Sequence, residues 1–415
     1  MNDLKNGQPF VEKRTPLSIV NMYILKNPIL FWIKKNLFDT ILSTILTIFS
    51  VWLLVKLLFG LIIPIISMNW TVIGDNLKLI LTGSYPISQL WRAWLCVSYI
   101  SLFGGASFGL ASRKIPKAMV AILLLEGLLI TLPFSGLAKF FLAANIVLSV
   151  AGFFLIRAFG KSKRLRIIVV AWIVFLPFAF ICILGFTGQG GFWPVVATNY
   201  WGGLLLSLLI ALTSIALSFP IGLLLALGRR SGLKFIKVVC TILIEVVRGV
   251  PLITILFIAY LIVPLALPKS MNPSVFIRAM IGIIMFHSAY MAEDFRGGLQ
   301  GIPRTQYEAA ASLNLSKAKT MILVILPQVF KRMIPVLVSR LTGIIKDTSL
   351  ISIIGLLDMI GISSAIISNP KYMTSSPQVL FFMAVIYFVI CYSISLASTK
   401  IEKNLGISTK QGASL

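Results

Sequence analysis

Repeated apolar stretches of about 20 residues limit what this chain can fold into, because a bilayer core about 30 Å thick takes roughly that many residues per helical crossing. Of the 415 residues, 58% are hydrophobic and only 12% are charged, and the mean hydropathy is +0.98. This composition is far too apolar for a soluble domain. A transmembrane barrel would show short alternating segments instead. The sequence therefore predicts an all-α polytopic membrane protein.

About ten transmembrane helices are predicted from the apolar stretches. They cover 38–62, 94–111, 117–135, 139–156, 167–186, 202–227, 240–266, 275–292, 333–357 and 379–398. The first stretch follows Lys34 and Lys35, as a secretory signal would, but it is too long and starts too late to be a cleaved one. We therefore expect it to be an uncleaved anchor.

The basic residues follow the membrane topology. The net charge is +25. With a cytoplasmic N-terminus, the cytoplasmic segments hold Lys5, Lys13, Arg14, Lys26, Lys34, Lys35, Arg113, Lys114, Lys117, Arg157, Lys161, Lys163, Arg164, Arg166, Arg229, Arg230, Lys234, Lys237, Arg296, Arg304, Lys317, Lys319, Lys331, Arg332, Lys400, Lys403 and Lys410. The opposite loops hold only Lys78, Arg92, Lys139, Lys269 and Lys371. This positive-inside bias predicts that both termini are cytoplasmic. No soluble domain is present to display a nucleic-acid patch, so no nucleic-acid partner is expected.

The cysteines and the single histidine offer little chemistry. Cys96, Cys182, Cys240 and Cys391 fall in or beside apolar spans and form neither a CxxC pair nor a disulfide framework. We interpret them as small core residues. One histidine, His287, cannot build a multi-histidine metal site, so no metal is expected and His287 is predicted to pack or to lie at an interface.

The organisation changes near residue 190, where the polar, glycine-rich stretch 187–200 suits an external connection between two helix groups. The predicted parts are a cytoplasmic segment at 1–37, N-terminal transmembrane helices at 38–186, a second transmembrane domain at 199–403 and a cytoplasmic tail at 404–415. No strong internal repeat is visible, which weighs mildly against a carrier built from inverted repeats.

The cytoplasmic connection at about 293–332 has the most specific local pattern. Thr305 with Glu308 three residues later fits a capping box, so a helix is expected just after Pro303. Three consecutive alanines, 309–311, leave a flat face for another backbone. Asn314 suits a left-handed corner.

Beyond the corner, Ser316 can cap the next helix, and Pro327 is expected to end or kink it. An exposed helix–corner–helix of this kind suggests a docked partner, and the alternative is a hairpin that lies on lipid headgroups.

The same connection resembles the EAA loop of ABC-transporter permeases, whose pattern is EAA, three residues, glycine, nine residues, a hydrophobic residue and Leu-Pro. Here Glu308, Ala309 and Ala310 are followed at the matching distances by Asn314, and then by Leu326 and Pro327. Asn314 replaces the glycine, and since asparagine tolerates the same backbone region we expect the corner to survive.

Three further segments resemble the polar amino acid branch of these permeases, the histidine and glutamine type. Residues 245–252 are similar to its E-x-x-R-G-x-P-L segment, 289–298 to its A-Y-x-x-E-x-x-R-G-G segment, and 346–350 to its K-D-T-S-L segment. The resemblance covers roughly 199–403 and implies a five-helix type I ABC permease core. The extended N-terminal half further resembles the larger permease subunit of general L-amino acid transporters.

The resemblance implies a non-catalytic permease subunit of an ATP-driven importer of L-amino acids in the bacterial inner membrane. Its implied partners are a second permease, expected to be a different chain so that the pair is a heterodimer, two ATPase subunits and a periplasmic amino-acid-binding protein. The chain has no GxxxxGK[ST] loop, so ATP and Mg²⁺ are expected in the partner ATPase and no cofactor in this chain. Glu308, Ala309, Ala310, Asn314, Leu326 and Pro327 are the implied ATPase-coupling residues.

Charged residues inside spans are costly, which makes them candidates for the translocation pathway. Glu245 and Arg248 are three apart on one predicted helix face and are expected to pair, with a structural role at the inner mouth favoured. The ninth span offers Arg340, Lys346, Asp347, Thr348 and Ser349. An amino acid needs opposite charges a few ångströms apart, and hydrogen bonding between core helices is the equally weighted alternative for these residues.

Two other function classes remain open at this point. An ion-coupled secondary transporter or channel would also be polytopic, but few carboxylates lie within the spans and the EAA spacing argues against it. A membrane-embedded enzyme would need clustered metal ligands or a nucleophile motif, and the sequence has neither.

Overall fold

The computed structural model describes residues 28–67, 70–112, 114–132, 134–188, 191–268, 272–404 and 406. Within these residues the fold is helical, and the pairing between extended segments is limited to isolated bridges, Thr187 with Pro194 and Gly203 with Asp358. The all-α prediction is confirmed. The chain divides at Trp70 into two compact units, which are described separately. Most of the predicted 1–37 segment and of the 404–415 tail lies outside the described residues.

The first unit consists of helix α2 (Pro28–Leu37) and helix α3 (Ile41–Ser67). The Thr47 hydroxyl donates to the carbonyl of Leu37 at 2.8 Å and closes the corner between them. The 27 residues of α3 are apolar apart from small hydroxyl residues and Lys56, so α3 is long enough to cross a bilayer.

The second unit begins with five N-terminal helices, which are α4 (Thr71–Thr82), α5 (Leu90–Ala111), α6 (Lys117–Thr131), α7 (Gly136–Leu155) and α8 (Lys161–Leu184). Helices α5 and α7 touch backbone to backbone. A β-carbon on Gly105 would lie 2.0 Å from the Ser149 carbonyl oxygen, and one on Gly152 would lie 2.0 Å from that of Leu102. Glycines allow this close approach, as small residues do in many membrane helix pairs.

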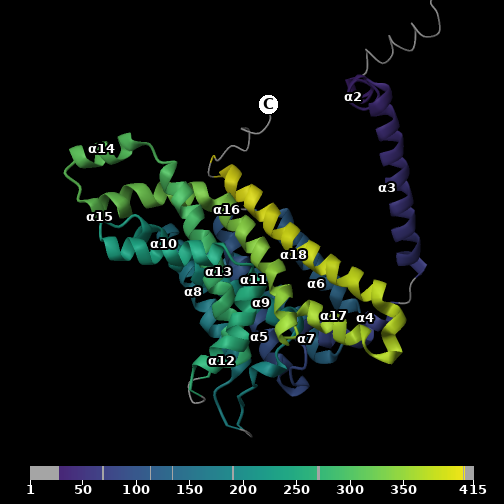
Figure 1. The fold of residues 1–415 in the computed structure, drawn as a ribbon. Coiled ribbons are helices and arrows are strands. Elements are labelled where there is room, and N and C mark those ends of the chain that lie inside the picture. Colours follow the sequence, from purple (N-terminus) through teal and green to yellow (C-terminus); the bar gives the residue numbers. More distant parts are fainter. Residues whose placement is uncertain are drawn as a thin grey trace, which may run out of the picture. The chain divides into compact units, whose positions relative to one another are not determined.

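The second unit continues with the C-terminal helices. The α-helices are α9 (Gly203–Arg229), α10 (Lys234–Arg248), α11 (Leu252–Phe257), α12 (Val263–Ala266), α13 (Val275–Gln300), α14 (Arg304–Ser312), α15 (Lys317–Lys319), α16 (Leu326–Asp347), α17 (Met359–Ile367) and α18 (Ser376–Asn404). Helix α13 is the central one, because 56% of its most apolar stretch is buried, against 11% for α18. Figure 1 shows α14 and α15 projecting beyond one end of α13, with α12 near the other end.

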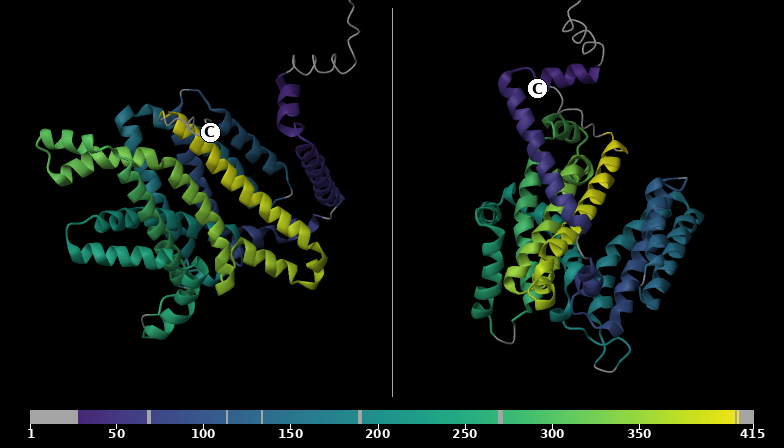
Figure 2. Two further views of the ribbon diagram at one scale, coloured as in Figure 1. Left: turned by 45° about the horizontal axis from the view of Figure 1, so that its top comes forward. Right: turned by 90° about the vertical axis from the view of Figure 1, so that its right-hand side faces the viewer.

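The N-terminal helices and the C-terminal helices are tied together at the end of α13 opposite to α14. Gly83, directly after α4, touches Gly202, directly before α9: a β-carbon on Gly83 would lie 2.5 Å from the Cα of Gly202. Gly203 has a φ of +57°, and a β-carbon there would meet the Ile80 carbonyl oxygen at 2.1 Å. As a result α5 to α8 lie beside the C-terminal helices in Figure 2.

The described residues contain eight helices long and apolar enough to span a membrane, or nine if one bent pair counts as a span. The difference from about ten arises at 117–135, where α6 has only 15 residues and is too short to count. The bent pair corresponds to the predicted span 240–266: α10 and the α11–α12 segment meet at 106°. Pro251, which has no amide hydrogen, follows Gly249 at this break.

Candidate transport site

The predicted coupling segment forms a short helix that begins where the sequence places it. Helix α14 starts at Arg304, directly after Pro303. The predicted capping box is wrong, because no side chain caps this helix. Pro303 occupies the cap position, which puts Thr305 inside the first turn, where its hydroxyl cannot accept from the free amides in the capping geometry.

The corner after α14 has the expected conformation. Asn314 has a φ of 54° and is the non-glycine residue with a positive φ within the described part of the chain. The Leu315 amide returns to the Ala310 carbonyl at 3.1 Å, and the Ser316 hydroxyl accepts from the Lys319 amide at 3.4 Å. The left-handed corner and the serine cap are both confirmed.

Pro327 does not end the second helix. A π-helical turn, η6 (Thr320–Ile325), lies directly before it, and the helical path continues from Lys317 to Ile354. Proline has no amide hydrogen for the carbonyl one turn back, and its ring needs room there. The wider π turn supplies that room, so the helix can continue. The coupling segment is therefore continuous with α16.

Helix α14 has one free face and one packed face. Glu308 and Ala309 are exposed, whereas Ala310 is only 3% exposed. The Gln328 amide donates to the side-chain oxygen of Gln306 at 3.0 Å, which links α14 to α16. Ala310 therefore holds the helix in place, and the free surface is on the Glu308 and Ala309 side.

The base of the coupling segment packs into a cluster that joins the long helices. The members of this cluster that come from α13 and from the η6–α16 region include Met291, Phe295, Leu299, Ile325, Leu326, Val329 and Met333. Ala226 of α9 and Ile244 of α10 belong to the same cluster. The base of the segment and the long helices therefore share one closely packed cluster.

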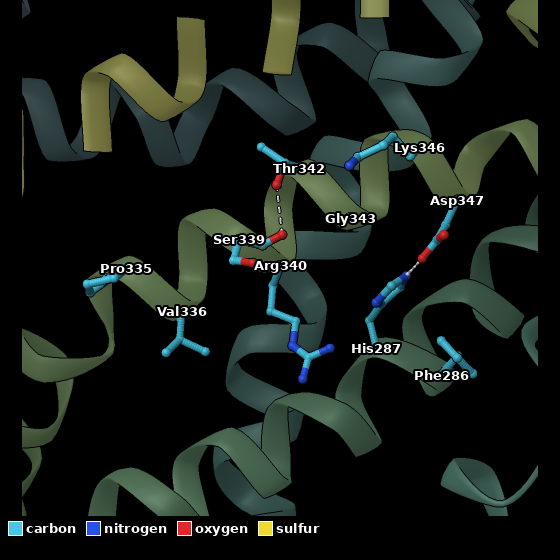
Figure 3. Close-up of a pocket in the computed structure, with 10 residues that line it drawn as sticks. All are labelled: Phe286, His287, Pro335, Val336, Ser339, Arg340, Thr342, Gly343, Lys346 and Asp347. Atoms are coloured by element: carbon cyan, nitrogen blue, oxygen red, sulfur yellow. Dashed lines mark hydrogen bonds and ion pairs between the residues drawn. The ribbon is translucent and has the colours of Figure 1, made fainter. Parts of the chain in front are cut away.

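A cavity of about 670 Å³ opens between α13 and α16 (Figure 3). Its lining consists of Phe286, His287, Pro335, Val336, Ser339, Arg340, Thr342, Gly343, Lys346 and Asp347. Three of the pathway candidates, Arg340, Lys346 and Asp347, therefore share one wall. Both lining elements belong to this chain, and together they form a wall rather than a closed tunnel.

Arg340 is held by a carboxylate outside the cavity lining. Its Nε and a terminal nitrogen donate to the two oxygens of Asp294 at 2.5 and 2.9 Å. This bidentate geometry occupies the guanidinium and fixes its direction toward α13. Asp294 was not among the predicted site residues, although adjacent acids at 293 and 294 are unusual in a chain with 12 acidic residues.

Lys346 and Asp347 remain as the opposite charges in the cavity. Lys346 has no ion pair with any described residue and is exposed. Asp347 Oδ2 lies 3.4 Å from Nε2 of His287, whose side chain is almost fully buried. His287, predicted to pack or to lie at an interface, does pack, and it also lines the cavity beside an acid. Figure 3 shows this pair at one end of the cavity.

Thr348 and Ser349 lie outside the cavity lining. The α-helix gives way at Thr348 to a tighter helix, η7 (Thr348–Ile354), which changes the direction of the following side chains. Thr348 is fully buried and its hydroxyl donates to the Ile345 carbonyl at 2.8 Å. Neither of these two hydroxyl residues therefore contributes to the cavity.

Glu245 and Arg248 pair as predicted, and they belong to a larger ion-pair network. The Arg229 guanidinium lies 2.8 Å from Glu245 and 3.5 Å from Glu293, and Arg248 lies 3.9 Å and 3.6 Å from the same two acids. Arg296 Nε donates to Glu293 at 2.7 Å. The network joins α9, α10 and α13 between the cavity and α14, which fits the structural role that the sequence favoured.

Comparison with known proteins identifies relatives of the whole chain. Residues 218–406 match the family model described as "Binding-protein-dependent transport system inner membrane component". The inner membrane amino-acid ABC transporter permease YhdY of Escherichia coli is 37% identical over 377 residues, which are 90% of this chain and 92% of YhdY.

Two further relatives show how the similarity extends along the chain. The glutamate/glutamine/aspartate/asparagine transport system permease BztC of Rhodobacter capsulatus is 33% identical and covers 90% of this chain and 93% of its own length. A probable glutamine ABC transporter permease of Bacillus subtilis, GlnP, is 32% identical over 49% of this chain and 91% of its own. With its apolar helices and these full-length relatives, the chain belongs to the multi-pass inner-membrane permeases of amino-acid ABC transporters.

Proposed function

We propose that this chain forms one side of the pathway of an ATP-driven, binding-protein-dependent importer of L-amino acids. The observation that carries the proposal is that two opposite charges, Lys346 and Asp347, line the cavity between α13 and α16. An amino acid in its zwitterionic form presents one ammonium and one carboxylate, which is one partner for each of these two charges. Among the relatives, YhdY is an amino-acid permease and BztC is a permease for glutamate, glutamine, aspartate and asparagine, which supports the same class of substrate.

In this proposal Asp347 receives the α-ammonium and Lys346 the α-carboxylate. A zwitterion can pair with both charges and a neutral solute with neither, so the zwitterion is favoured. Asp294 keeps the Arg340 guanidinium occupied and away from Asp347. His287, whose Nε2 lies 3.4 Å from Asp347 Oδ2, holds the carboxylate at one end of the cavity.

The second wall of the cavity comes from another permease subunit. The lining residues belong to α13 and α16 alone, so this chain supplies half of an enclosure. A heterodimer with a different permease fits the extra N-terminal helices of this chain. A periplasmic binding protein delivers the amino acid to the end of α13 opposite to α14, and both termini of the chain are cytoplasmic.

Coupling to the ATPase runs through α14. The exposed side with Glu308 and Ala309 docks in a groove of the ATPase, which binds ATP and Mg²⁺ itself. Ala310, Asn314, Leu326 and Pro327 act within the chain: they hold α14 on α16 and keep the corner fixed. Closure of two ATPase subunits then moves α14 and, through the packed cluster around Phe295, the helices that line the cavity.

The test of the transport site uses the reconstituted importer. Asp347→Asn and Lys346→Gln are each expected to reduce ATP-dependent amino-acid uptake by at least tenfold, since each removes one charge partner of the substrate. Lys400→Gln removes a similar exposed charge away from the cavity and serves as the control. Uptake that continues at the same rate without ATP would instead favour an ion-coupled carrier.

The test of coupling compares two neighbouring alanines in native membranes. A cysteine crosslinker at exposed Ala309 is expected to capture an ATP-hydrolysing subunit, whereas the same crosslinker at Ala310, 3% exposed, is not. The two substitutions add the same atoms one residue apart, so the difference reports which face is docked. Failure at Ala309 in intact, transporting membranes would contradict the docking model.

A further inference from the structure

Two loops of the N-terminal helices meet on the same side of the unit as α14. Helix α8 runs from Lys161 to Leu184, beside the tie to the C-terminal helices, and α9 returns to Arg229 in the ion-pair network below α14. The α7–α8 loop at Lys161 therefore lies at the α14 end. The α5–α6 loop is fastened to it, because Arg157 donates to the Ser112 carbonyl at 2.7 Å.

The contact between α5 and α7 extends to this end and holds the two loops together. A β-carbon on Gly109 of α5 would lie 2.5 Å from the Phe153 carbonyl oxygen of α7. Arg164 further fixes the α7–α8 loop by donating to the carbonyls of Phe159 and Arg157 at 2.6 and 2.7 Å. Arg157 and Arg164 thus shape a single surface from two loops.

That surface carries four exposed cations, Lys114, Lys117, Lys163 and Arg166, which we call the basic patch. None of the four has an ion pair with a residue in the described part of the chain. Between residues 112 and 166 the sequence holds one acid, Glu126, which lies nine residues along α6 from Lys117. About two and a half helical turns separate them. The basic patch therefore has no counter-charge of its own.

Exposed apolar side chains lie directly beside the basic patch. Phe154 and Leu155 at the end of α7 are 54% and 61% exposed, Phe159 is 46% exposed, and Leu165 is 57% exposed. Phe154 and Leu155 belong to a predicted membrane span, so a soluble acidic protein could not cover them. Acyl chains can cover these residues while a headgroup meets the cations.

We propose that the basic patch binds the phosphate headgroup of an anionic phospholipid in the leaflet on the α14 side, with the acyl chains against Phe154 and Leu155. The positive-inside rule requires only that cations lie on one side of the membrane when the chain is inserted. It does not require two loops fastened into one surface by Arg157 and Arg164. The site is separate from the amino-acid cavity and does not depend on the proposed transport function.

The experiment measures thermal stability of the purified full-length permease in a neutral detergent with added lipid. Phosphatidylglycerol is expected to raise the melting temperature by about 5 °C over phosphatidylcholine, and native mass spectrometry should show the anionic lipid retained. The gain should shrink in high salt. An equal effect of both lipids on the wild type overturns the proposal, and so does an equal effect of glycerol phosphate, which lacks acyl chains.

Variants locate the site. The quadruple variant Lys114→Gln, Lys117→Gln, Lys163→Gln and Arg166→Gln should lose the difference between the two lipids. The matched control, Lys234→Gln, Lys237→Gln, Lys400→Gln and Lys403→Gln, removes as many exposed cations predicted to lie on the same side and should keep it. A quadruple variant that exchanges lysine and arginine at the basic patch should also keep it. The proposal is overturned if the control loses the difference in melting temperature between the two lipids. It is also overturned if the glutamine variant keeps that difference.

Discussion

The two halves of the second unit hold their helices together by different means. Helices α5 and α7 meet through glycines, with backbone atoms in contact around Gly105 and Gly152. Helices α9, α10, α13 and α16 meet through ion pairs as well as apolar packing, with Glu293 and Asp294 as the main acids. The glycine contact between α5 and α7 allows one arrangement of these two helices. The ion pairs among the C-terminal helices allow an arginine to move from one acid to another.

This difference bears on which half of the unit can move during the proposed transport cycle. Arg229 and Arg248 each lie near both Glu245 and Glu293, so a shift of α10 against α13 can trade one contact for the other. A glycine contact has no second position of similar energy, because interiors that are closely packed resist displacement. We infer that α5 and α7 serve as a fixed frame and that the C-terminal helices move beside it.

The largest expected effect comes from breaking the frame with a single methyl group. Gly105→Ala puts a β-carbon 2.0 Å from the Ser149 carbonyl oxygen, so α5 and α7 must separate. We expect a loss of about 3 kcal/mol, seen as a fall in the melting temperature of the purified protein. Overpacking against backbone cannot be relieved by a side-chain rotation.

The matched variant is Gly127→Ala in α6, where an added β-carbon meets nothing within 4 Å. Alanine is the better helix former by about 1 kcal/mol, so this variant should be neutral or slightly stabilising. If both variants behave alike, the close contact between α5 and α7 is absent in the protein and the frame must be abandoned.

The next effect is expected at the centre of the ion-pair network. Glu293→Gln removes the acid that contacts Arg229, Arg248 and Arg296 and leaves three cations close together. Because the Glu293 side chain is only 21% exposed, we expect a cost of about 2 kcal/mol and a lower melting temperature. Asp39→Asn, which removes an exposed acid from the corner between α2 and α3, should change little. Equal shifts in both variants would show that net charge, rather than the network, is responsible.

The sequence predicts local features well and long-range ones poorly. Asn314 and Ser316 were predicted correctly because a corner and a cap depend on residues within a few positions of each other. The bond between Arg340 and Asp294 joins residues 46 positions apart, and no spacing rule points to it. The contact of α5 with α7 was missed for the same reason, although its glycines are visible in the sequence.

The errors at element boundaries have equally physical causes. Apolar length alone predicted a span at 117–135, but hydropathy does not report where a helix stops, and α6 ends at Thr131. At 240–266 the sequence predicted one span, because the residues before and after Pro251 are mostly apolar. Hydropathy does not report the direction of the chain, so the bend at Pro251 was missed. His287 was correctly expected to pack, but its place beside Asp347 depends on how α13 lies against α16, which the sequence of either helix does not contain.

A smaller effect is expected from Asp358, which has no ion pair with any residue that the structure describes. Asp358 is fully buried at the start of α17, and burial raises its pKa to about 6 from the usual 3.8, although the amides of Gly361 and Ile360 oppose the rise. The folded protein therefore holds the proton more tightly than the unfolded chain. The resulting stability is complete below about pH 3.8 and is lost as pH rises through about 6.

We expect the wild type to be more stable at pH 5 than at pH 7.5 by about 1 kcal/mol through this group. Asp358→Asn keeps an oxygen that can cap α17 and should abolish that part of the difference, as melting curves at the two pH values can measure. A pH dependence that is unchanged in the variant would mean that a group other than Asp358 causes it.

The smallest effect tests the exchange of partners itself. Glu245→Gln removes one acid of the network, but Arg229 and Arg248 both keep Glu293 within 3.6 Å, and the Glu245 side chain is already 51% exposed. Exposed pairs contribute little, so we expect a loss below about 0.5 kcal/mol, far less than for Glu293→Gln in the same melting experiment. A loss as large as that of Glu293→Gln would mean that the cations cannot shift between acids. The C-terminal helices would then be as fixed as α5 and α7, and movement during transport would have to come from a different part of the molecule.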